Sequence, residues 1–192
     1  MQLKTIRTFI AIDLPSAIKN IILEIQFSFK ILNLKASWVK PENAHLTLKF
    51  LEVTPFKQLE NIRNLLAQEL QNLNPFQISL GGLEVFPNWN RPRVFWIGIK
   101  DKNQSLHNLW SLVGSQLEGV GFARNNKKFL PHLTLARIKS PYRKDQLQKR
   151  VAAWRPLSIE PFEATEVKLY KSQLTPQGSI YTVLETFPFR KP

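Results

Sequence analysis

The stretches His45-Leu46-Thr47-Leu48 and His132-Leu133-Thr134-Leu135 are one four-residue word, written twice in a chain that contains only three histidines. Each word alternates polar and apolar residues, which is the pattern of a strand with one face buried. The histidine and threonine of each word therefore share one face, and both leucines point to the core. The two histidines lie 132 − 45 = 87 residues apart in a chain of 192 residues. This spacing predicts two half-chains that each contribute one unit to a shared site.

Two imidazoles, each beside a hydroxyl, are suited to acid and base catalysis on a phosphate. Imidazole titrates near neutral pH, so His45 and His132 can act as base and acid in one turnover. The hydroxyls of Thr47 and Thr134 can donate hydrogen bonds to the phosphate oxygens as negative charge develops there. A single histidine on a strand is more often a structural residue, and the repetition is what favours catalysis. Neither word has a carboxylate at ligand spacing and the chain has no cysteine, so we predict no metal and no cofactor.

The composition indicates a basic globular protein. The chain has 27 Lys and Arg against 14 Asp and Glu, a net charge of +13. Such a charge favours polyanions, nucleic acid first among them, although it is also found on surfaces that only contact solvent. The densest basic cluster flanks the second histidine word and consists of Arg124, Lys127, Lys128, Arg137, Lys139, Arg143 and Lys144.

The length fits a single bilobed domain over residues 1–192. No apolar run reaches the roughly 20 residues of a membrane span, and the first residues lack the pattern of a secretory signal. We therefore expect a cytoplasmic protein with no membrane partner. The expected partner is a polyanion, with nucleic acid the first candidate, and we expect a monomer.

Strand-like and helix-like segments alternate along the chain. Strands are expected over 7–14, from His45 to about Leu51, over 76–85, 93–99, 162–174 and 180–187, and at the second histidine word. Helices are expected from Ser16 to about Leu32, after a Thr54-Pro55 cap, over the stripe Leu106 to Leu117, and over 143–154. Alternation outweighs continuous apolar runs in the strands, which favours antiparallel sheets. The fold class is therefore α+β, with two lobes facing each other across a cleft.

Several sequence motifs of the chain together resemble those of the 2H phosphoesterase superfamily, and more narrowly those of its RNA 2′,3′-cyclic phosphodiesterases, also called 2′-5′ RNA ligases. The resemblance covers nearly the whole chain. Its words are Arg7-Thr8-Phe9-Ile10-Ala11-Ile12-Asp13-Leu14-Pro15, Pro41-Glu42-Asn43-Ala44-His45-Leu46-Thr47-Leu48-Lys49-Phe50-Leu51 and Phe129-Leu130-Pro131-His132-Leu133-Thr134-Leu135-Ala136-Arg137. The family usually has a glycine after Phe-Leu, where this chain has Glu52.

The resemblance implies a bilobed fold of two antiparallel sheets with outer helices around a central cleft, related by a pseudo-twofold axis. It implies hydrolysis of an RNA terminal 2′,3′-cyclic phosphate to a 2′-phosphate without metal, and a reverse 2′-5′ ligation. On this basis His132 is expected to be the base on water and His45 the acid to the leaving oxygen, although the sequence does not fix the order. Transfer RNA fragments are one source of such RNA ends among several.

Three further residues are candidates for substrate binding. Arg137 can bind phosphate bidentately, but strict alternation from His132 points it away, so a bulge or strand end is required. Lys49 shares the face of His45 and Thr47 on strict alternation, and a solvated lysine at the rim is an equal alternative. Phe9 can stack a nucleobase if Ile10 and Ile12 face the core, and a plain core phenylalanine is again an equal alternative.

Two other functions stay open on the sequence alone. The first is an RNA-binding module whose histidines only bond to the strands. The second keeps the fold but acts on 2′,5′-oligonucleotides.

The third histidine, His107, lies outside the repeated words and is expected at the surface.

Overall fold

The computed structural model describes residues 4–123, 128–154, 159–176 and 178–190. The elements follow in the order β1 (Thr5–Asp13), α1 (Ser16–Lys30), β2 (Ala36–Trp38), η1 (Pro41–Asn43), β3 (His45–Pro55), η2 (Phe56–Gln58), α2 (Leu59–Leu70), β4 (Phe76–Phe86), β5 (Val94–Lys100), α3 (Ser105–Gly119), β6 (His132–Ile138), α4 (Lys144–Ala153), β7 (Phe162–Ala164), β8 (Glu166–Thr175) and β9 (Gly178–Pro188).

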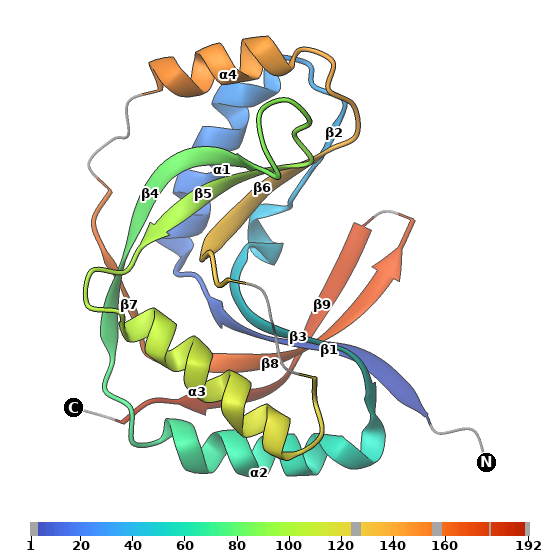
Figure 1. Ribbon diagram of the computed structural model, residues 1–192, viewed down its shortest axis with the longest axis vertical. Helices are drawn as coiled ribbons and strands as arrows, with labels where there is room; N and C mark the ends of the chain where they lie inside the picture. Colours follow the sequence, from blue (N-terminus) through green and yellow to red (C-terminus); the bar gives the residue numbers. More distant parts are fainter. Residues whose placement is uncertain (1–3, 124–127, 155–158, 177, 191–192) are drawn as a thin grey trace.

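The strands form two antiparallel sheets, one in each lobe. The lower sheet in Figure 1 has the order β3-β1-β8-β9, and the upper sheet has the order β2-β6-β5-β4-β7. Helices α1 and α4 lie against the upper sheet, and α2 and α3 lie against the lower one (Figure 1). The expected α+β class, with two lobes, antiparallel sheets and outer helices, is confirmed.

The two lobes do not correspond to the two halves of the sequence. The lower sheet combines β1 and β3 from the first half with β8 and β9 from the end of the chain. Helix α1 leaves the lower sheet and packs on the upper one, where the Phe29 and Phe95 rings lie 5.0 Å apart. The two histidine words do lie in opposite sheets, on β3 and β6, so their pairing survives although the lobes interleave.

The expected strand over 162–174 is wrong, because this segment is two strands in different sheets. Residues of β7 pair with β4 in the upper sheet, and residues of β8 pair with β1 in the lower sheet. The buried positions change phase at the break, from Phe162 and Ala164 to Val167 and Leu169. Since strand side chains repeat every two residues, that shift marks a change of face and an end of the first strand.

The expected helix cap at Thr54-Pro55 is also wrong, because β3 extends to Pro55 and α2 begins at Leu59. The Thr54 side chain is buried, and its hydroxyl lies 2.7 Å from that of Thr8 on the neighbouring strand. A buried hydroxyl needs a hydrogen-bonding partner, and this cross-strand pair supplies one to each threonine.

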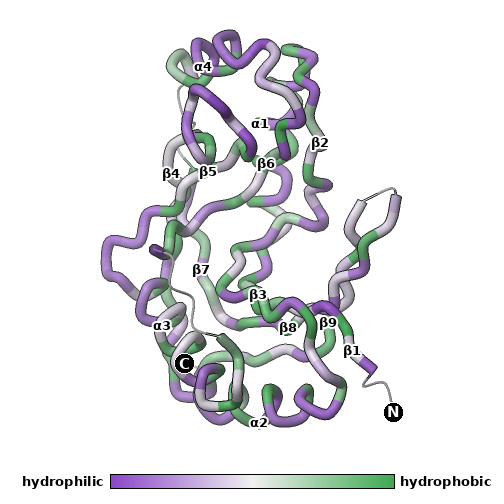
Figure 2. The backbone as a smooth tube through the Cα atoms, turned by 45° about the vertical axis from the view of Figure 1, so that its right-hand side comes forward, coloured by the Kyte–Doolittle hydropathy of each residue, from purple (hydrophilic) through white to green (hydrophobic). Residues whose placement is uncertain are grey.

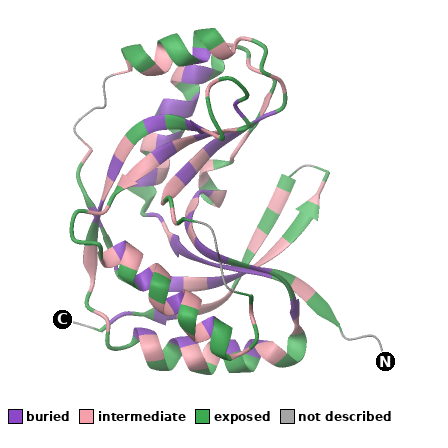
Figure 3. Ribbon diagram, viewed as in Figure 1, coloured by how far each residue is buried: buried purple, intermediate pink, exposed green. Residues whose placement is uncertain are grey.

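Buried residues concentrate where helices face the sheets (Figure 3), and the strands alternate along their length between hydrophilic and hydrophobic residues (Figure 2). One cluster of buried apolar residues runs through both lobes. A second, small cluster of Phe9, Ala11 and Tyr170 lies on the other face of the lower sheet, with Tyr181 packed against it.

Both histidine words are followed by a bulge at the same place. In β3, Thr47 pairs with Ala11 and Lys49 with Ile10, so Leu48 has no partner on β1. In β6, Thr134 pairs with Trp96 and Ala136 with Phe95, so Leu135 has no partner on β5. An extra residue inverts the faces that follow it. As a result Lys49 and Ala136 point inward, while the next residues, Phe50 and Arg137, point outward.

A second irregularity in β3 falls at the position where the resemblance expects glycine. Thr8 pairs with Glu52 and Phe9 with Phe50, so Leu51 is skipped, and Glu52 has φ = 50°. This left-handed conformation costs an L-residue with a side chain roughly 1–2 kcal/mol, which glycine avoids at some cost in chain entropy.

We predict that Glu52→Gly raises the free energy of unfolding by about 0.5–1 kcal/mol, because it relieves the left-handed backbone. Urea unfolding followed by circular dichroism measures the change. Glu52→Ala is the matched control, because it removes the carboxylate and keeps the Cβ atom. Equal stability of the glycine and alanine variants would show that the backbone at this position is not strained.

Candidate active site

A pocket of about 440 Å³ lies between the two lobes and is lined by both histidine words. Four of its lining residues are the paired polar residues His45, Thr47, His132 and Thr134. The rest of the lining comes from β2, η1, the residues that flank them, and strands β3, β5, β6 and β9, and consists of Ser37, Trp38, Val39, Lys40, Asn43, Ala44, Phe50, Val94, Arg137, Gly178, Ser179 and Tyr181. The structure therefore brings together the polar faces of two strands that are 87 residues apart (132 − 45).

Each imidazole is held by the main chain two residues before it. The Nδ1 of His45 lies 2.7 Å from the carbonyl oxygen of Asn43, and the Nδ1 of His132 lies 2.8 Å from that of Leu130. A carbonyl oxygen can only accept, so Nδ1 carries the hydrogen in both rings. Nε2 is then the nitrogen available for proton transfer, as an acceptor when the ring is neutral and a donor when it is charged.

Aromatic rings fix the plane of each imidazole. The His45 ring lies 4.6 Å from the Phe9 ring and 5.2 Å from the Tyr181 ring, measured between centroids. The His132 ring meets Phe86 edge-on at 4.9 Å and Trp96 at 5.7 Å. Packing on this scale locks the ring rotamers, which pre-organises both nitrogens.

The two histidines have opposite charged neighbours. Burial lowers the pKa of both rings; Asp13 raises the pKa of His45, and Arg137 lowers that of His132. The charges of His132, which faces the same pocket, and of Lys19 also lower the pKa of His45.

Asp13 lies opposite His45 in the strand ladder and is held in its charged form. Its carboxylate accepts hydrogen bonds from Lys19 at 2.8 Å and Lys168 at 3.0 Å. Burial opposes ionisation, but these bonds outweigh it and lower the pKa of Asp13. Burial and the Asp13 carboxylate raise the pKa of the neighbouring Tyr170 to about 12.

Arg137 lines the pocket because of the bulge at Leu135. The carbonyl oxygen of Leu135 accepts hydrogen bonds from the Val39 amide at 2.9 Å and from Nε2 of the buried Gln26 at 2.9 Å. Helix α1 thus supports the irregular strand that turns Arg137 to the phosphate side. The sequence required such a bulge for Arg137, but it did not identify Gln26.

The expectation that Lys49 shares the His45 face is wrong, because the bulge at Leu48 inverts the strand before Lys49 is reached. Its side chain is 5% exposed, and Nζ donates to the Ala123 carbonyl at 2.9 Å. Phe50 lines the pocket instead and is 62% exposed.

Phe9 lies on the predicted face, opposite to Ile10 and Ile12, but it is 2% exposed. Tyr170 stacks on its ring at 5.0 Å, and His45 packs against it as well. No open ring face is left for a nucleobase, so Phe9 supports His45 and does not contact substrate.

The β8–β9 hairpin forms one wall of the pocket; the sequence predicted its two strands but not this role. Gly178, Ser179 and Tyr181 line the pocket, and Nδ2 of Asn43 donates to the Ser179 carbonyl at 2.9 Å. Asn43 therefore orients His45 with its main chain and holds the hairpin with its side chain. Figure 1 shows the hairpin projecting from the lower sheet beside the upper lobe.

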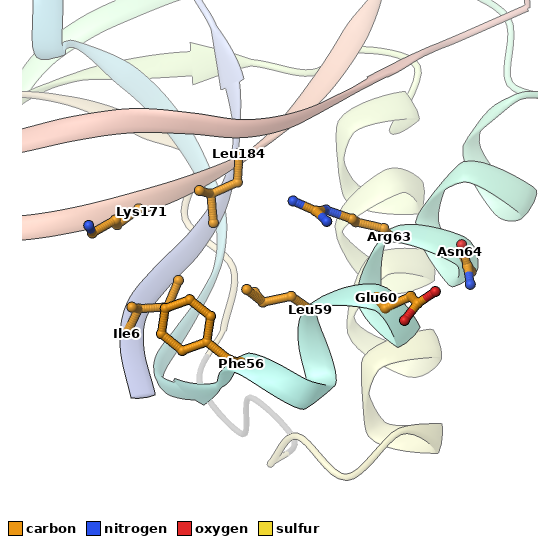
Figure 4. Close-up of a pocket in the computed structure, with 8 residues that line it drawn as sticks. All are labelled: Ile6, Phe56, Leu59, Glu60, Arg63, Asn64, Lys171 and Leu184. Carbon is orange, nitrogen blue, oxygen red and sulfur yellow. The ribbon is translucent and has the colours of Figure 1, made fainter. Parts of the chain in front are cut away.

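Another hollow, of about 630 Å³, lies between α2 and the lower sheet (Figure 4). It is lined by Ile6, Phe56, Leu59, Glu60, Arg63, Asn64, Lys171 and Leu184. Its arginine is ion-paired with Glu185 at 3.3 Å, and it contains no histidine. The third histidine lies elsewhere, at the start of α3, with Nδ1 2.8 Å from an Asp101 oxygen.

Over the described ranges, no three His, Cys, Asp or Glu side chains gather as a metal site would require. In the same ranges no helix is both long and apolar enough to cross a membrane.

Residues 15–175 match the 2′-5′ RNA ligase superfamily. The chain belongs to the 2′-5′ RNA ligase superfamily. Two relatives, both named RNA 2′,3′-cyclic phosphodiesterase, come from Methanocaldococcus jannaschii and Aquifex aeolicus. The first is 37% identical over 93% of this chain and 98% of its own, and the second is 36% identical over 96% and 98%.

Two solved structures have a similar fold. A Thermus thermophilus protein superimposes with a TM-score of 0.79 at 26% identity, over 96% of this chain and 98% of its own. Escherichia coli LigT complexed with 3′-AMP superimposes with a TM-score of 0.76 at 25% identity, over 98% of this chain and 100% of its own.

We predict that His45 and His132 both titrate below the ordinary value of 6.5, because burial disfavours their charged forms. NMR titration of the ring protons measures both midpoints. Arg137→Ala should raise the midpoint of His132, because it removes the cation that disfavours the charged ring.

The same shifts make stability depend on pH. The unfolded chain takes up these two protons first as the pH falls, so the free energy of unfolding should decrease below about pH 6.5. The decrease in the free energy of unfolding should be larger in the wild type than in a variant that lacks both rings. A wild type whose free energy of unfolding stays level, while that of the variant falls, would contradict the assignment of lowered pKa values to the two histidines.

Proposed function

We propose that this protein is a metal-independent RNA 2′,3′-cyclic phosphodiesterase that hydrolyses a terminal 2′,3′-cyclic phosphate to a 2′-phosphate. The observation that carries the proposal is the pocket in which two imidazoles, each with Nδ1 bound to a carbonyl, stand beside two threonines and Arg137. The names of the relatives and the LigT complex with a nucleoside 3′-phosphate support the same substrate class.

The reaction needs one proton removed and one supplied. Nε2 of neutral His132 takes a proton from water as the water oxygen attacks phosphorus. The bond from phosphorus to the ribose 3′-oxygen breaks, and protonated His45 gives its Nε2 proton to that oxygen. The products are a 2′-phosphate and a 3′-hydroxyl, and exchange of protons with solvent restores both rings.

The charged neighbours support this division of roles. Arg137 disfavours the charged form of His132, which suits a base that must start neutral. Burial lowers the pKa of His45 overall, but Asp13 opposes this effect, and the anionic substrate adds to the opposition, which suits an acid that must be protonated in the complex. The reverse reaction exchanges the roles and joins a 5′-hydroxyl as a 2′-5′ bond.

The non-bridging oxygens are bound by donors from both strands. The Thr47 and Thr134 hydroxyls lie on the same strand faces as the histidines, and Arg137 supplies a charged, bidentate donor. Arg137 and Phe50 occupy equivalent places after the two words, so β6 presents a cation to the pocket where β3 presents an aromatic ring. We assign the aromatic side, Phe50 with Tyr181, to the terminal nucleoside.

The partners we propose are RNA ends that carry a 2′,3′-cyclic phosphate, transfer RNA fragments included, met in the cytoplasm by a monomer. The open pocket wall formed by Phe50 suits any nucleobase, because a stacking contact does not read base edges.

We predict that His45→Ala and His132→Ala each lower kcat by about 10²–10⁴-fold, because each removes one proton-transfer group. The assay follows an RNA oligonucleotide ending in a 2′,3′-cyclic phosphate, in the presence of a chelator, and identifies the product by mass spectrometry and NMR. His107→Ala is the matched control, because it removes a histidine outside the pocket.

Other results would select the alternatives. A binding module leaves the cyclic phosphate intact in the wild type. An enzyme for 2′,5′-oligonucleotides cleaves those internal bonds in preference to the cyclic end. Activity that requires an added divalent metal would reject the two-histidine mechanism, as would wild-type rates in either histidine variant.

We predict that Phe50→Ala raises KM for nucleoside 2′,3′-cyclic phosphates and changes kcat less. Base stacking is worth roughly 1–3 kcal/mol, which corresponds to about 5–150-fold. Phe50→Tyr keeps a ring and should retain most of the affinity. Steady-state kinetics on both variants measures this, and an unchanged KM in Phe50→Ala would place the base elsewhere.

A further inference from the structure

The upper sheet carries a line of cations that starts in the pocket and runs away from it. Ser37 of β2 pairs with Arg137 of β6, and both line the pocket. The ladder continues past the strand ends, because the Lys139 amide donates to the Lys35 carbonyl at 2.7 Å. Directly opposed residues share a face, and so do residues two apart. Lys35 and Lys139 therefore lie on the face of Arg137, and we call these three residues the cation stripe.

The cation stripe is poorly neutralised by the protein. Lys35, Lys139 and Arg137 are exposed, and no ion pair between described residues involves any of them. Like charges placed directly opposite on a ladder repel each other. Two facing lysines beside an arginine thus form an arrangement that an external anion would stabilise.

The proposed RNA substrate carries such negative charge on only one side of its terminal ribose. The terminal ribose carries a base at one position and the rest of the RNA strand, with one negative charge per nucleotide, at its 5′-oxygen. Phe50 and Tyr181 of the lower sheet line one part of the pocket and Arg137 of the upper sheet lines another, while Lys40, directly before η1, is a second cation of the lining. Outside the pocket, the hairpin exposes Leu174, Ile180 and Val183, and residues 172–183 include no lysine or arginine that could pair with a phosphate.

We propose that the cation stripe binds the backbone of the RNA strand that leads to the cyclic phosphate. This inference rests on the proposed function and extends it, because it makes the protein prefer an oligonucleotide over a mononucleotide. The phosphates nearest the 3′ end contact Lys139 and Lys35, next to Arg137 at the reacting phosphorus. Figure 2 shows mainly hydrophilic segments at α4 and the turns beside it, where the strand would leave the protein.

The test compares two double variants that lose the same charge. Lys35→Gln with Lys139→Gln removes two cations of the stripe. Lys57→Gln with Lys100→Gln removes two exposed lysines that have no ion pair among the described residues and lie outside the pocket lining. The ligands are a six-nucleotide RNA ending in a 2′-phosphate and a nucleoside 2′-phosphate, titrated at several salt concentrations.

The stripe variant should lose the salt dependence of two phosphate contacts. The slope of log K against log salt for the oligonucleotide should become shallower by about 1.4, at about 0.7 per single-strand contact. The advantage of the wild type over this variant should then shrink about sevenfold between 50 and 200 mM salt. The ratio of oligonucleotide to nucleoside affinity should fall in the stripe variant and not in the control.

Equal slopes of log K against log salt in the two double variants would contradict the proposal that the cation stripe binds RNA. An equal loss of affinity for the oligonucleotide and the nucleoside 2′-phosphate would contradict it as well. Urea unfolding at low salt checks folding, and the stripe variant should be at least as stable as the wild type because a repulsion is removed. Turnover of a nucleoside 2′,3′-cyclic phosphate by the wild type tests the proposed function separately, so either idea can fail without the other.

Discussion

The site depends on two bulges that occur at the same position of β3 and β6. Each histidine word needs a regular strand to place its histidine and threonine on one face, and the residue after the word must then be turned inward. The unpaired Leu48 and Leu135 achieve this at the same point of both strands. Without the extra residue, Phe50 and Arg137 would point into the core and Lys49 would point into the pocket. A bulge beside an active site is a common means of re-aiming a side chain.

The two histidines have the same local geometry but different electrostatic surroundings. Both rings are held through Nδ1 by a carbonyl two residues earlier and both are packed against aromatic rings, so their shapes match. The surroundings differ, with Asp13 near one ring and Arg137 near the other. A symmetric scaffold with asymmetric charges allows one imidazole to give a proton while the other takes one.

The sequence predicted which strands carry the site better than it predicted the strand face on which each side chain lies. Alternation was sufficient for His45, Thr47, His132 and Thr134, because all four precede the bulges. It failed for Lys49, which follows one. A bulge had already been required for Arg137, and applying the same bulge to the other word would have replaced Lys49 with Phe50. Gln26, Asn43 and Tyr181 could not be found this way, because their roles depend on contacts between distant segments.

The strand that was expected over 162–174 shows what the interleaved lobes mean for the chain as a whole. Its two parts belong to different sheets, and the first strand of the protein lies between the third and the eighth. Neither lobe is therefore a continuous piece of polypeptide that a protease could release or a gene fusion could transplant. Truncation of the chain between β7 and β8 would remove two neighbouring strands from the lower sheet and leave the upper sheet with all of its own, so His45 would lose its hairpin wall while His132 kept its support.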